Sequence, residues 1–245
     1  MAQMTLSELL KNAKHAVVLT GAGISTLSGI PDFRGVGGLY HRKDIDAGKL
    51  FDIDYFRCDP GYYYKHSKDF LYNLDEKEPN IVHKALARLE EKGVIHAVIT
   101  QNIDDLHRIA GNKVVHEFHG NSSRFVCKQC DAVYPLKEIN ITEEPALCPR
   151  CGHLLKPDFI FFGEGIPYDA YQNSIDAAND CDVFIIIGTS GQVSPANTIP
   201  GIAKRHGSTI IEINKDRSLY TDYITDIYLE GKSGEILVEI ENLRI

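Results

Sequence analysis

Short runs of apolar residues recur along the chain and predict buried β-strands. These runs occupy residues 15–20, 94–100, 159–162, 183–188 and 209–213, with a weaker one at 227–229. Continuous runs of this length are typical of strands that are covered on both faces. Segments with helical spacing of apolar residues alternate with the runs, at residues 5–13, 80–92, 168–178, 197–206 and 234–243. The alternation predicts an α/β fold, in which helices cover both faces of a doubly wound parallel sheet.

Two stretches interrupt this rhythm and predict a second, smaller domain. Residues 39–79 are rich in Tyr, Asp and Lys and contain no clear strand. Residues 122–157 have the pattern of short strands and turns around two pairs of cysteines. We expect these two insertions to pack together, which leaves residues 1–38, 80–121 and 158–245 for the larger domain.

Four of the six cysteines stand in two C-x-x-C pairs, Cys127 with Cys130 and Cys148 with Cys151. Two intervening residues let both thiolates of a pair face one tetrahedral ion, and four thiolates fill the coordination shell of structural zinc. The spacing therefore predicts one structural Zn²⁺ with no position left for substrate or water. A redox dithiol is the alternative interpretation of these pairs. Disulfides are disfavoured, because a chain of this size with a full core does not need them.

A glycine-rich turn follows the first predicted strand. Gly21 and Gly23 match two glycines of the dinucleotide fingerprint G-x-G-x-x-G, and Thr26 stands in place of the third. Glycines at such a turn allow backbone amides to approach a pyrophosphate. A second loop, residues 29–38, is interpreted as a lid that orders over a ligand, with an ordinary surface loop as the alternative. Its side chains suited to ligand contact are Asp32, Phe33 and Arg34.

Polar residues follow two further predicted strands. The run that begins at residue 94 ends in the sequence TQNID, residues 100–104, at the edge where α/β sheets bind ligands. The amides and carboxylate there suit a ribose or an amide group, and helix capping by Asn102 or Asp104 is the alternative. His119 follows a short predicted strand and precedes a glycine that permits close backbone approach. A structural histidine is the alternative at that position.

Taken together, these motifs resemble those of the sirtuin family. The similarity rests on residues 21–26, 29–35, 100–104, 119–120 and 188–190 and on both cysteine pairs, in the family order. Sirtuins are NAD-dependent protein lysine deacylases, and the resemblance implies a compact prokaryotic member. It also implies a Rossmann-like NAD-binding domain joined to a smaller domain, made of a helical module at 39–79 and a zinc ribbon at 122–157. NAD and an acyl-lysine peptide are expected in the cleft between them.

The resemblance assigns individual residues to ligand binding. Those implied to hold NAD are Gly21, Ala22, Gly23, Thr26, Asp32, Phe33, Arg34, Gln101, Asn102, Ile103, Asp104, His119, Gly188, Thr189, Ser190, Asn214 and Lys232. Asn214 is implied to hold the adenosine half, and Lys232 to close the adenine pocket. A second set is implied to bind the substrate peptide by strand addition: Ile160, Phe162, Gly163, Glu164 and Val193.

The implied reaction transfers an acetyl group from lysine to ADP-ribose and releases nicotinamide and O-acetyl-ADP-ribose. His119, Asn102 and Asp104 are implied to be catalytic, with His119 as the general base, since the ordinary pKa of histidine suits that role. A protein mono-ADP-ribosyltransferase that uses the same cleft is the alternative function. A non-catalytic NAD sensor is disfavoured by the intact catalytic set, and a zinc hydrolase by the closed four-cysteine shell.

Two departures from family patterns bear on the substrate. The three tyrosines at 62–64 are followed three residues on by Lys, His and Ser, so the Tyr-x-x-Arg pair of sirtuins that remove acidic acyl groups is missing. We therefore expect uncharged acyl groups, with acetyl first. Gly191 and Ser194 stand where the family pattern has larger residues. This difference predicts a looser peptide edge nearby.

Charge and composition exclude several other classes of protein. The chain has 26 Lys and Arg against 34 Asp and Glu, a net charge of −8, which argues against a general nucleic-acid binder. No apolar run is long enough to span a bilayer, and the N-terminus lacks the apolar region of a signal peptide. We expect a cytoplasmic monomer. Its expected partners are NAD and acetyl-lysine protein substrates, without nucleic acid or membrane.

Overall fold

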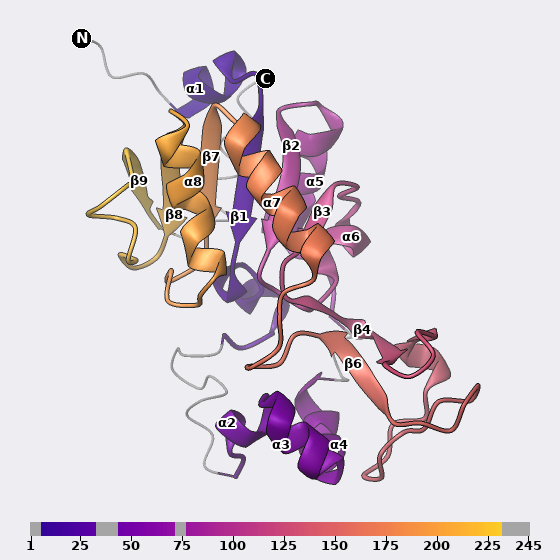
Figure 1. Ribbon diagram of the computed structural model, residues 1–245. Helices are drawn as coiled ribbons and strands as arrows, with labels where there is room; N and C mark the ends of the chain where they lie inside the picture. Colours follow the sequence, from indigo (N-terminus) through magenta and orange to yellow (C-terminus); the bar gives the residue numbers. More distant parts are fainter. Residues whose placement is uncertain (1–5, 33–43, 72–76, 232–245) are drawn as a thin grey trace.

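The computed structural model describes residues 6–32, 44–71 and 77–231 of the chain. The predicted helix at 234–243 and the predicted site residues Phe33, Arg34 and Lys232 lie outside the described residues. The described part comprises a large parallel sheet flanked by helices and a smaller antiparallel sheet with its own helices (Figure 1). Within this part, no helix combines the length and the apolar character that crossing a bilayer requires.

Parallel strands form the large sheet in the order β3-β2-β1-β7-β8-β9. Their bounds are β1 Ala16–Thr20, β2 Ile95–Thr100, β3 Val115–Glu117, β7 Val183–Ile187, β8 Thr209–Asn214 and β9 Ile227–Glu230. The chain runs outward from β1 to β3, returns to β7 on the other side of β1, and continues outward to β9. The strand order therefore reverses between β1 and β7. Their carboxyl ends open the crevice where sheets of this kind bind ligands.

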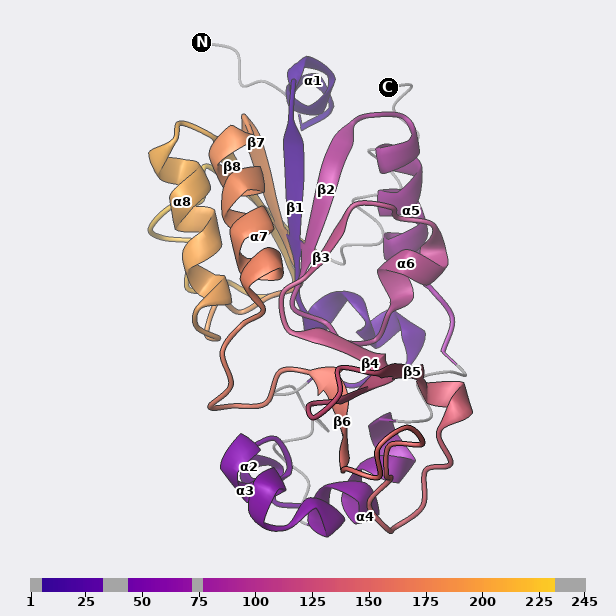
Figure 2. The same cartoon turned by 45° about the vertical axis from the view of Figure 1, so that its right-hand side comes forward.

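Helices cover both faces of this sheet, as the sequence pattern predicts. They are α1 (Leu6–Asn12), α5 (Ile81–Glu91), α6 (Leu106–Ala110), α7 (Tyr168–Asp180) and α8 (Ile199–Arg205). Val18 of β1 packs in one core with Leu86 of α5, whereas Leu19 packs in another with Ile199 of α8. Figure 2 shows α7 and α8 on one side of the sheet and α5 and α6 on the other. Successive side chains of a strand point to opposite faces, so a continuous apolar run supplies both cores.

The smaller sheet has the strand order β5-β4-β6 and is antiparallel. Its strands are β4 Gly120–Cys127, β5 Val133–Pro135 and β6 Leu155–Phe159. Helices α2 (Ala47–Leu50), α3 (Ile53–Cys58) and α4 (Pro60–Leu71) pack against it through a separate hydrophobic cluster. Short 3-10 turns complete the described elements: η1 (Ala22–Ile24), η2 (Thr26–Ser28), η5 (Leu136–Glu138) and η6 (Ala196–Thr198).

The strand predicted at 159–162 does not belong to the parallel sheet, so this prediction is wrong. Phe159 ends β6, which is antiparallel to β4. Phe161 instead enters an aromatic cluster, with ring centroids 5.2 Å from Phe56 and 5.4 Å from Tyr63. Periodicity alone does not tell a short apolar run in a sheet from one buried against helices. The small sheet also extends beyond residues 122–157, because it begins at residue 120 and ends at residue 159.

Two histidines are buried between α5 and α6. The rings of His83 and His107 lie 5.0 Å apart and are 0% and 2% exposed. Among the described residues, neither ring nitrogen of His83 has a hydrogen-bond partner. Burial lowers the pKa of His83 to about 4 and that of His107 to about 3, because a charged imidazole is poorly solvated there. Both rings are therefore neutral at pH 7.

Acid is expected to destabilise the fold through this pair. Below pH 6.5 both histidines take up protons in the unfolded chain, whereas in the folded chain the buried rings stay neutral. The free energy of unfolding therefore decreases as the pH falls from 6.5 toward 4. The loss is about 2 kcal/mol per histidine at pH 5. We expect His83→Leu to make the free energy of unfolding less dependent on pH between 7 and 5, as urea denaturation at each pH would measure.

His206, an exposed histidine at the end of α8, offers the matched control. His206→Leu should keep the full acid sensitivity of the wild-type chain. If His83→Leu showed the same dependence on pH as that control, the buried pair would not be the source of the acid sensitivity.

Candidate active site and metal centre

Two loops meet backbone to backbone at the point where the strand order reverses. Gly23 N–H donates to the carbonyl of Gly188 over 2.9 Å. A Cβ on Gly21 would lie 2.7 Å from the carbonyl oxygen of Gly188, and one on Gly23 would lie 2.8 Å from it. Gly188 itself has a φ of 65°, which favours glycine. The motif glycines are therefore required for the contact between the loops after β1 and β7, in addition to any approach to a ligand.

The turn after β1 carries the other predicted phosphate-binding residues. Ala22 begins η1, and the hydroxyl of Thr26 donates to the carbonyl of Gly23 over 2.9 Å. An open hollow of about 330 Å³ lies beside this turn. Its lining residues are Thr26, Gly29, Ile30, Pro31 and Asp32. The structure thus places Asp32 and Thr26 in one concave region, next to the glycine contact.

A buried polar triangle lies behind the same turn. The hydroxyl of Ser25 donates to Asp104 Oδ2 over 2.6 Å, and Asn102 Nδ2 lies 3.1 Å from both Ser25 Oγ and the carbonyl oxygen of Gly21. Burial raises the pKa of Asp104, whereas the hydrogen bond from Ser25 opposes the rise. The predicted residues Asn102 and Asp104 are therefore brought together. Sequence reasoning missed Ser25, although its place inside the 21–26 motif was an available signal.

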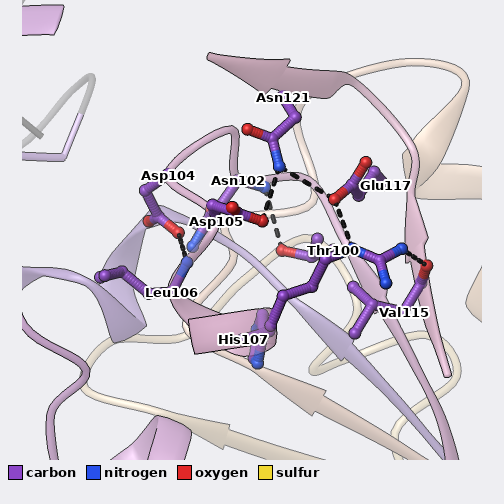
Figure 3. Close-up of a pocket in the computed structure, with 10 residues that line it drawn as sticks. Thr100, Asn102, Asp104, Asp105, Leu106, His107, Val115, Glu117 and Asn121 are labelled. Carbon is purple, nitrogen blue, oxygen red and sulfur yellow. Dashed lines mark hydrogen bonds and ion pairs between the residues drawn. The ribbon is translucent and has the colours of Figure 1, made fainter. Parts of the chain in front are cut away.

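A second polar cluster supports the 102–104 segment from the other side (Figure 3). Asp105 has a φ of 62°, unusual for a residue other than glycine. Asn121 Nδ2 donates to Asp105 Oδ1 over 2.8 Å and to Glu117 Oε1 over 2.9 Å. These side chains surround a cavity of about 10 Å³, which is near the size that one water needs. The cluster fixes the turn that carries Asn102 and Asp104.

His119 lies just before β4 with its ring orientation determined by a backbone carbonyl. His119 Nδ1 is 3.0 Å from the carbonyl oxygen of Gln101. A carbonyl can only accept a hydrogen bond, so Nδ1 carries the proton and Nε2 keeps its lone pair. Burial lowers the pKa of His119, opposed by the hydrogen bond to Gln101, so the neutral ring persists below pH 6.5. The arrangement leaves Nε2 able to accept a proton.

The glycine after His119 is required by close backbone contact. Gly120 has a φ of 72°, and a Cβ there would lie 2.2 Å from the carbonyl oxygen of Asp158. His119 O also accepts a hydrogen bond from Ile160 N–H over 2.9 Å. His119 and the start of the predicted peptide edge are therefore held together by the main chain.

The remaining predicted nucleotide residues gather at the ends of β2, β7 and β8. Gln101 Nε2 donates to Thr189 Oγ1 over 3.1 Å. Asn214 Oδ1 accepts from Thr189 N–H, and Asn214 Nδ2 donates to the carbonyl of Thr189, both over 3.1 Å. Ser190 is exposed beside them, and Ile103 is partly buried against the small-sheet cluster. The structure brings these residues to one edge, but the amide of Asn214 is turned toward the protein.

The predicted peptide-binding residues are only partly available for strand addition. Phe162 is 52% exposed, yet its N–H donates to Phe51 O and its carbonyl accepts from Ile53 N–H. The carboxylate of Glu164 accepts from the buried ammonium of Lys156 over 2.8 Å and from Phe161 N–H over 2.8 Å. Gly163 has a φ of 88°. Glu164 therefore closes a turn within the chain.

Val193, the last of the predicted peptide residues, lies on a different segment. It is half-buried in the stretch that follows Ser190, and its carbonyl accepts a hydrogen bond from Asn197 N–H over 3.0 Å. In the described residues no hydrogen bond joins it to the turn at 160–164. The predicted peptide residues thus come from two separate stretches of chain.

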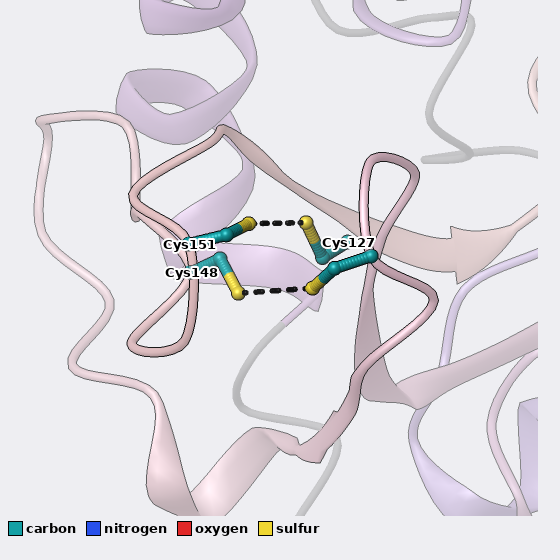
Figure 4. Close-up of side chains that lie close together, drawn as sticks. Cys127, Cys148 and Cys151 are labelled. Carbon is teal, nitrogen blue, oxygen red and sulfur yellow. Dashed lines mark hydrogen bonds between the residues drawn. The ribbon is translucent and has the colours of Figure 1, made fainter.

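The two cysteine pairs face one another across two loops (Figure 4). Cys127 Sγ lies 3.4 Å from Cys151 Sγ, and Cys130 Sγ lies 3.7 Å from Cys148 Sγ. All four sulfur atoms lie within 4.8 Å of one another. Zinc bonds to thiolate of 2.3 Å in a tetrahedron place sulfur atoms about 3.8 Å apart. The four thiolates thus fit one zinc ion. The 3.4 Å and 3.7 Å contacts join cysteines of different C-x-x-C pairs, whereas a redox dithiol would form within one pair.

Comparison with known proteins places the chain in a family. The family model described as "Sir2 family" matches residues 21–195. This chain belongs to the Sir2 family, the sirtuins. It is 42% identical to NAD-dependent protein deacylase 2 of Pyrobaculum aerophilum over 96% of this chain and 92% of that protein. It is 43% identical to NAD-dependent protein deacylase of Thermococcus kodakarensis, again over 96% and 92%.

Solved sirtuin structures resemble this sirtuin over nearly its whole length. A Sir2 protein in complex with deacetylated p53 peptide and 3′-O-acetyl-ADP-ribose has a TM-score of 0.88 at 37% identity and covers 96% of both chains. Sir2Tm bound to a propionylated peptide has a TM-score of 0.86 at 34% identity, covering 99% of this chain and 98% of that one. The Rossmann-like sheet, the small antiparallel sheet and the four-cysteine centre of this chain agree with that family.

Zinc removal is expected to unfold the small sheet of this sirtuin. Zinc binding at a structural site contributes roughly 10–16 kcal/mol, and Cys127 lies at the end of β4. A strong chelator should remove one zinc per chain and lower the thermal midpoint, as metal analysis and circular dichroism would measure. Cys151→Ser should lose the metal in the same way.

Cys58, an exposed cysteine in α3, supplies the control for this experiment. Cys58→Ser should retain the full zinc content and the wild-type midpoint. A metal-free protein with an unchanged midpoint would contradict a structural role for the ion.

Proposed function

We propose that this chain is an NAD-dependent protein lysine deacetylase. It transfers the acetyl group to ADP-ribose and releases nicotinamide and O-acetyl-ADP-ribose. The observation that carries the proposal is the neutral His119, whose Nδ1 is held by Gln101 O so that Nε2 is free to act as a base. This histidine is held by Gln101, the residue that precedes Asn102 after β2. The relatives named above are deacylases of the same family.

NAD fits the crevice at the carboxyl ends of β1 and β7. The glycine contact brings the 21–26 turn and the 188–190 loop together at this edge, where dinucleotides bind in such sheets. When bound, NAD supplies a ribose carbon that becomes electrophilic as nicotinamide departs. The half-buried amide of Asn102 and the carboxyl group of Asp104 suit the carboxamide of nicotinamide, and Ser25 contacts both side chains.

His119 is assigned the role of general base toward a ribose hydroxyl. Its ring cannot turn without losing the hydrogen bond to Gln101 O, and its lowered pKa keeps Nε2 unprotonated at neutral pH. The acetyl-lysine peptide is assigned to the segment after β6, which begins at the hydrogen bond between Ile160 and His119. Zinc has no chemical role in this proposal, because four thiolates leave no open coordination position.

The division of the chain follows from the same assignments. The larger, NAD-binding domain comprises residues 1–38, 80–121 and 158–245, and the smaller domain comprises 39–79 and 122–157. Separate hydrophobic clusters under the two sheets support a division into two domains, with the small sheet extending to residues 120 and 159. A cytoplasmic monomer that does not bind nucleic acid completes the proposal. No observation favours transfer of ADP-ribose to protein, and the relatives named above carry the name deacylase.

A direct assay tests the function. The protein incubated with an acetyl-lysine peptide and NAD should yield deacetylated peptide, nicotinamide and O-acetyl-ADP-ribose, as mass spectrometry would detect. His119→Ala should lower turnover by ~10²–10⁴-fold, since a general base contributes about that much. It should keep the wild-type affinity for ADP-ribose in calorimetry. His206→Ala, remote from the site, should leave turnover unchanged.

Two results would each contradict the proposal. Deacetylation in the absence of NAD would indicate hydrolysis, and ADP-ribose attached to the peptide would indicate the transferase. Full activity of His119→Ala would remove that residue from the role of base.

The acyl group is proposed to be uncharged, with acetyl preferred. Tyr63 and Tyr64 are almost fully buried, and Tyr64 OH donates to the carbonyl of Leu155 over 2.9 Å. The ring of Tyr62 lies 4.4 Å from that of His66. These tyrosines pack within the small domain, and none of them is followed by Arg at the third position. On one peptide sequence, deacetylation should therefore be faster than desuccinylation, and the reverse order would refute this preference.

A further inference from the structure

Glu212 of β8 is a buried carboxylate outside the set of residues assigned above. Its side chain is 0% exposed. Oε1 accepts from Asn214 Nδ2 over 2.8 Å, and Oε2 accepts from the hydroxyl of Thr225 over 2.8 Å. The hydroxyl of Thr221 lies 3.1 Å from Oε1 and 2.9 Å from Oε2. Across residues 6–32, 44–71 and 77–231, no salt bridge includes Glu212, so neutral donors alone hold this carboxylate.

Burying a carboxylate without an ion-pair partner costs free energy of folding. The hydrogen bonds of Glu212 therefore show what this carboxylate positions. Asn214 uses its Nδ2 group both for Glu212 and for the carbonyl of Thr189, and its Oδ1 accepts from Thr189 N–H. One amide thereby holds both main-chain polar groups of Thr189. Glu212 determines which way that amide faces, because a carboxylate accepts from the NH₂ group and would repel the carbonyl oxygen.

The same network continues to the proposed base. Thr189 Oγ1 accepts from Gln101 Nε2 over 3.1 Å, and the carbonyl oxygen of Gln101 lies 3.0 Å from His119 Nδ1. A contiguous series of hydrogen bonds therefore joins Glu212 to His119 across the ends of β8, β7 and β2. Thr189 forms the middle of this series, at the edge where NAD is proposed to lie.

A second observation places the 218–225 segment against the same loop. Leu219 N–H donates to the carbonyl of Ser190 over 3.1 Å. The ring of Tyr220 occupies the space that a side chain at Gly191 would take, since a Cβ there would lie 2.8 Å from the ring. The glycine at 191 thus accommodates Tyr220. The prediction of a looser edge at this position overlooked the ring that fills it.

We propose that Glu212 is a positioning residue for the adenosine half of NAD. It acts through Asn214 on the Thr189–Ser190 main chain, with Thr221 and Thr225 fixing its own carboxylate. The inference rests on the proposed function, and it changes the part assigned to Asn214. The side chain of Asn214 orients the loop, and Thr189 and Ser190 then meet the ligand.

This role predicts an effect on binding rather than on chemistry. Glu212→Ala removes one of the two acceptors of Asn214 Nδ2 and leaves only the carbonyl of Thr189, so the amide is held less firmly and the 189–190 loop is positioned less precisely. ADP-ribose affinity should fall about tenfold, and KM for NAD should rise by a similar factor. The kcat at saturating NAD and the KM for the acetyl peptide should stay within twofold of the wild type.

Two variants separate positioning from general destabilisation. Glu212→Gln keeps an oxygen for Asn214 and offers its NH₂ group to the threonine hydroxyls, so it should restore ADP-ribose affinity to within threefold of the wild type. Ile211→Ala removes a buried side chain from the opposite face of the same strand, in the core under α5. It should lower the thermal midpoint at least as much as Glu212→Ala while ADP-ribose affinity stays unchanged.

Calorimetry with ADP-ribose is the deciding measurement, because it requires no turnover. Wild-type affinity in Glu212→Ala, or an equal loss in Ile211→Ala, would overturn the role of Glu212. If Glu212→Ala does not fold, Glu212→Asp answers the same question, since the shorter side chain withdraws from Asn214 and should weaken binding several-fold. A wild-type protein that fails to bind ADP-ribose would instead refute the proposed function.

Discussion

Two glycine turns lie in main-chain contact at the carboxyl ends of β1 and β7, and the candidate site is arranged around that contact. The hydrogen bond from Gly23 to Gly188 and the absence of side chains at Gly21 and Gly23 bring the loops closer than any Cβ would allow. Around the contact stand the Ser25–Asn102–Asp104 triangle on one side and Thr189 with Asn214 on the other. A larger residue at any of these glycines would separate the two halves of the crevice.

The ladder between β4 and β6 forms the second constraint, and it connects the zinc centre to the proposed base. Cys127 ends β4 and pairs with Leu155 at the start of β6. At the other end of the ladder, Gly120 pairs with Phe159, and Ile160 donates to His119 O. The zinc centre therefore takes no part in the proposed reaction. It holds one end of β4 and β6, and the other end of these strands positions His119 and the proposed peptide segment.

Polar networks lie both where the two sheets meet and at the opposite end of the crevice. Arg124 of β4 bonds to Glu117 over 2.8 Å and to Asp158 over 2.6 Å, and so links β3, β4 and β6. Glu212 holds the opposite end of the crevice through neutral donors. Such networks contribute little net stability, because desolvation offsets much of the attraction. Their value here lies in orientation, since each one determines the position of a main-chain segment that faces the crevice.

The sequence alone predicts the α/β architecture, the zinc centre and the candidate site residues, because each depends on a strong local pattern or motif. Continuous apolar runs separated by helical spacing predict the doubly wound sheet, because only strands covered on both faces need such runs. The C-x-x-C spacing predicts the zinc centre, because the spacing itself determines which thiolates can share an ion. The sequence also singles out Asn102, Asp104 and His119 as candidate site residues, because they lie inside contiguous motifs.

The tertiary structure decided the features that depend on partners distant in sequence. The run at 159–162 matches a strand pattern, but its aromatic neighbours come from α3 and α4 and draw Phe161 into the small domain. Glu164 is implied by the family resemblance to bind the peptide, yet its carboxylate is bonded to Lys156 within the chain. Glu212 carries no local signal, since an acidic residue in an apolar run gains its role only when Asn214, Thr221 and Thr225 surround it. Local sequence specifies which elements form, whereas the packing of remote elements determines what each polar side chain holds.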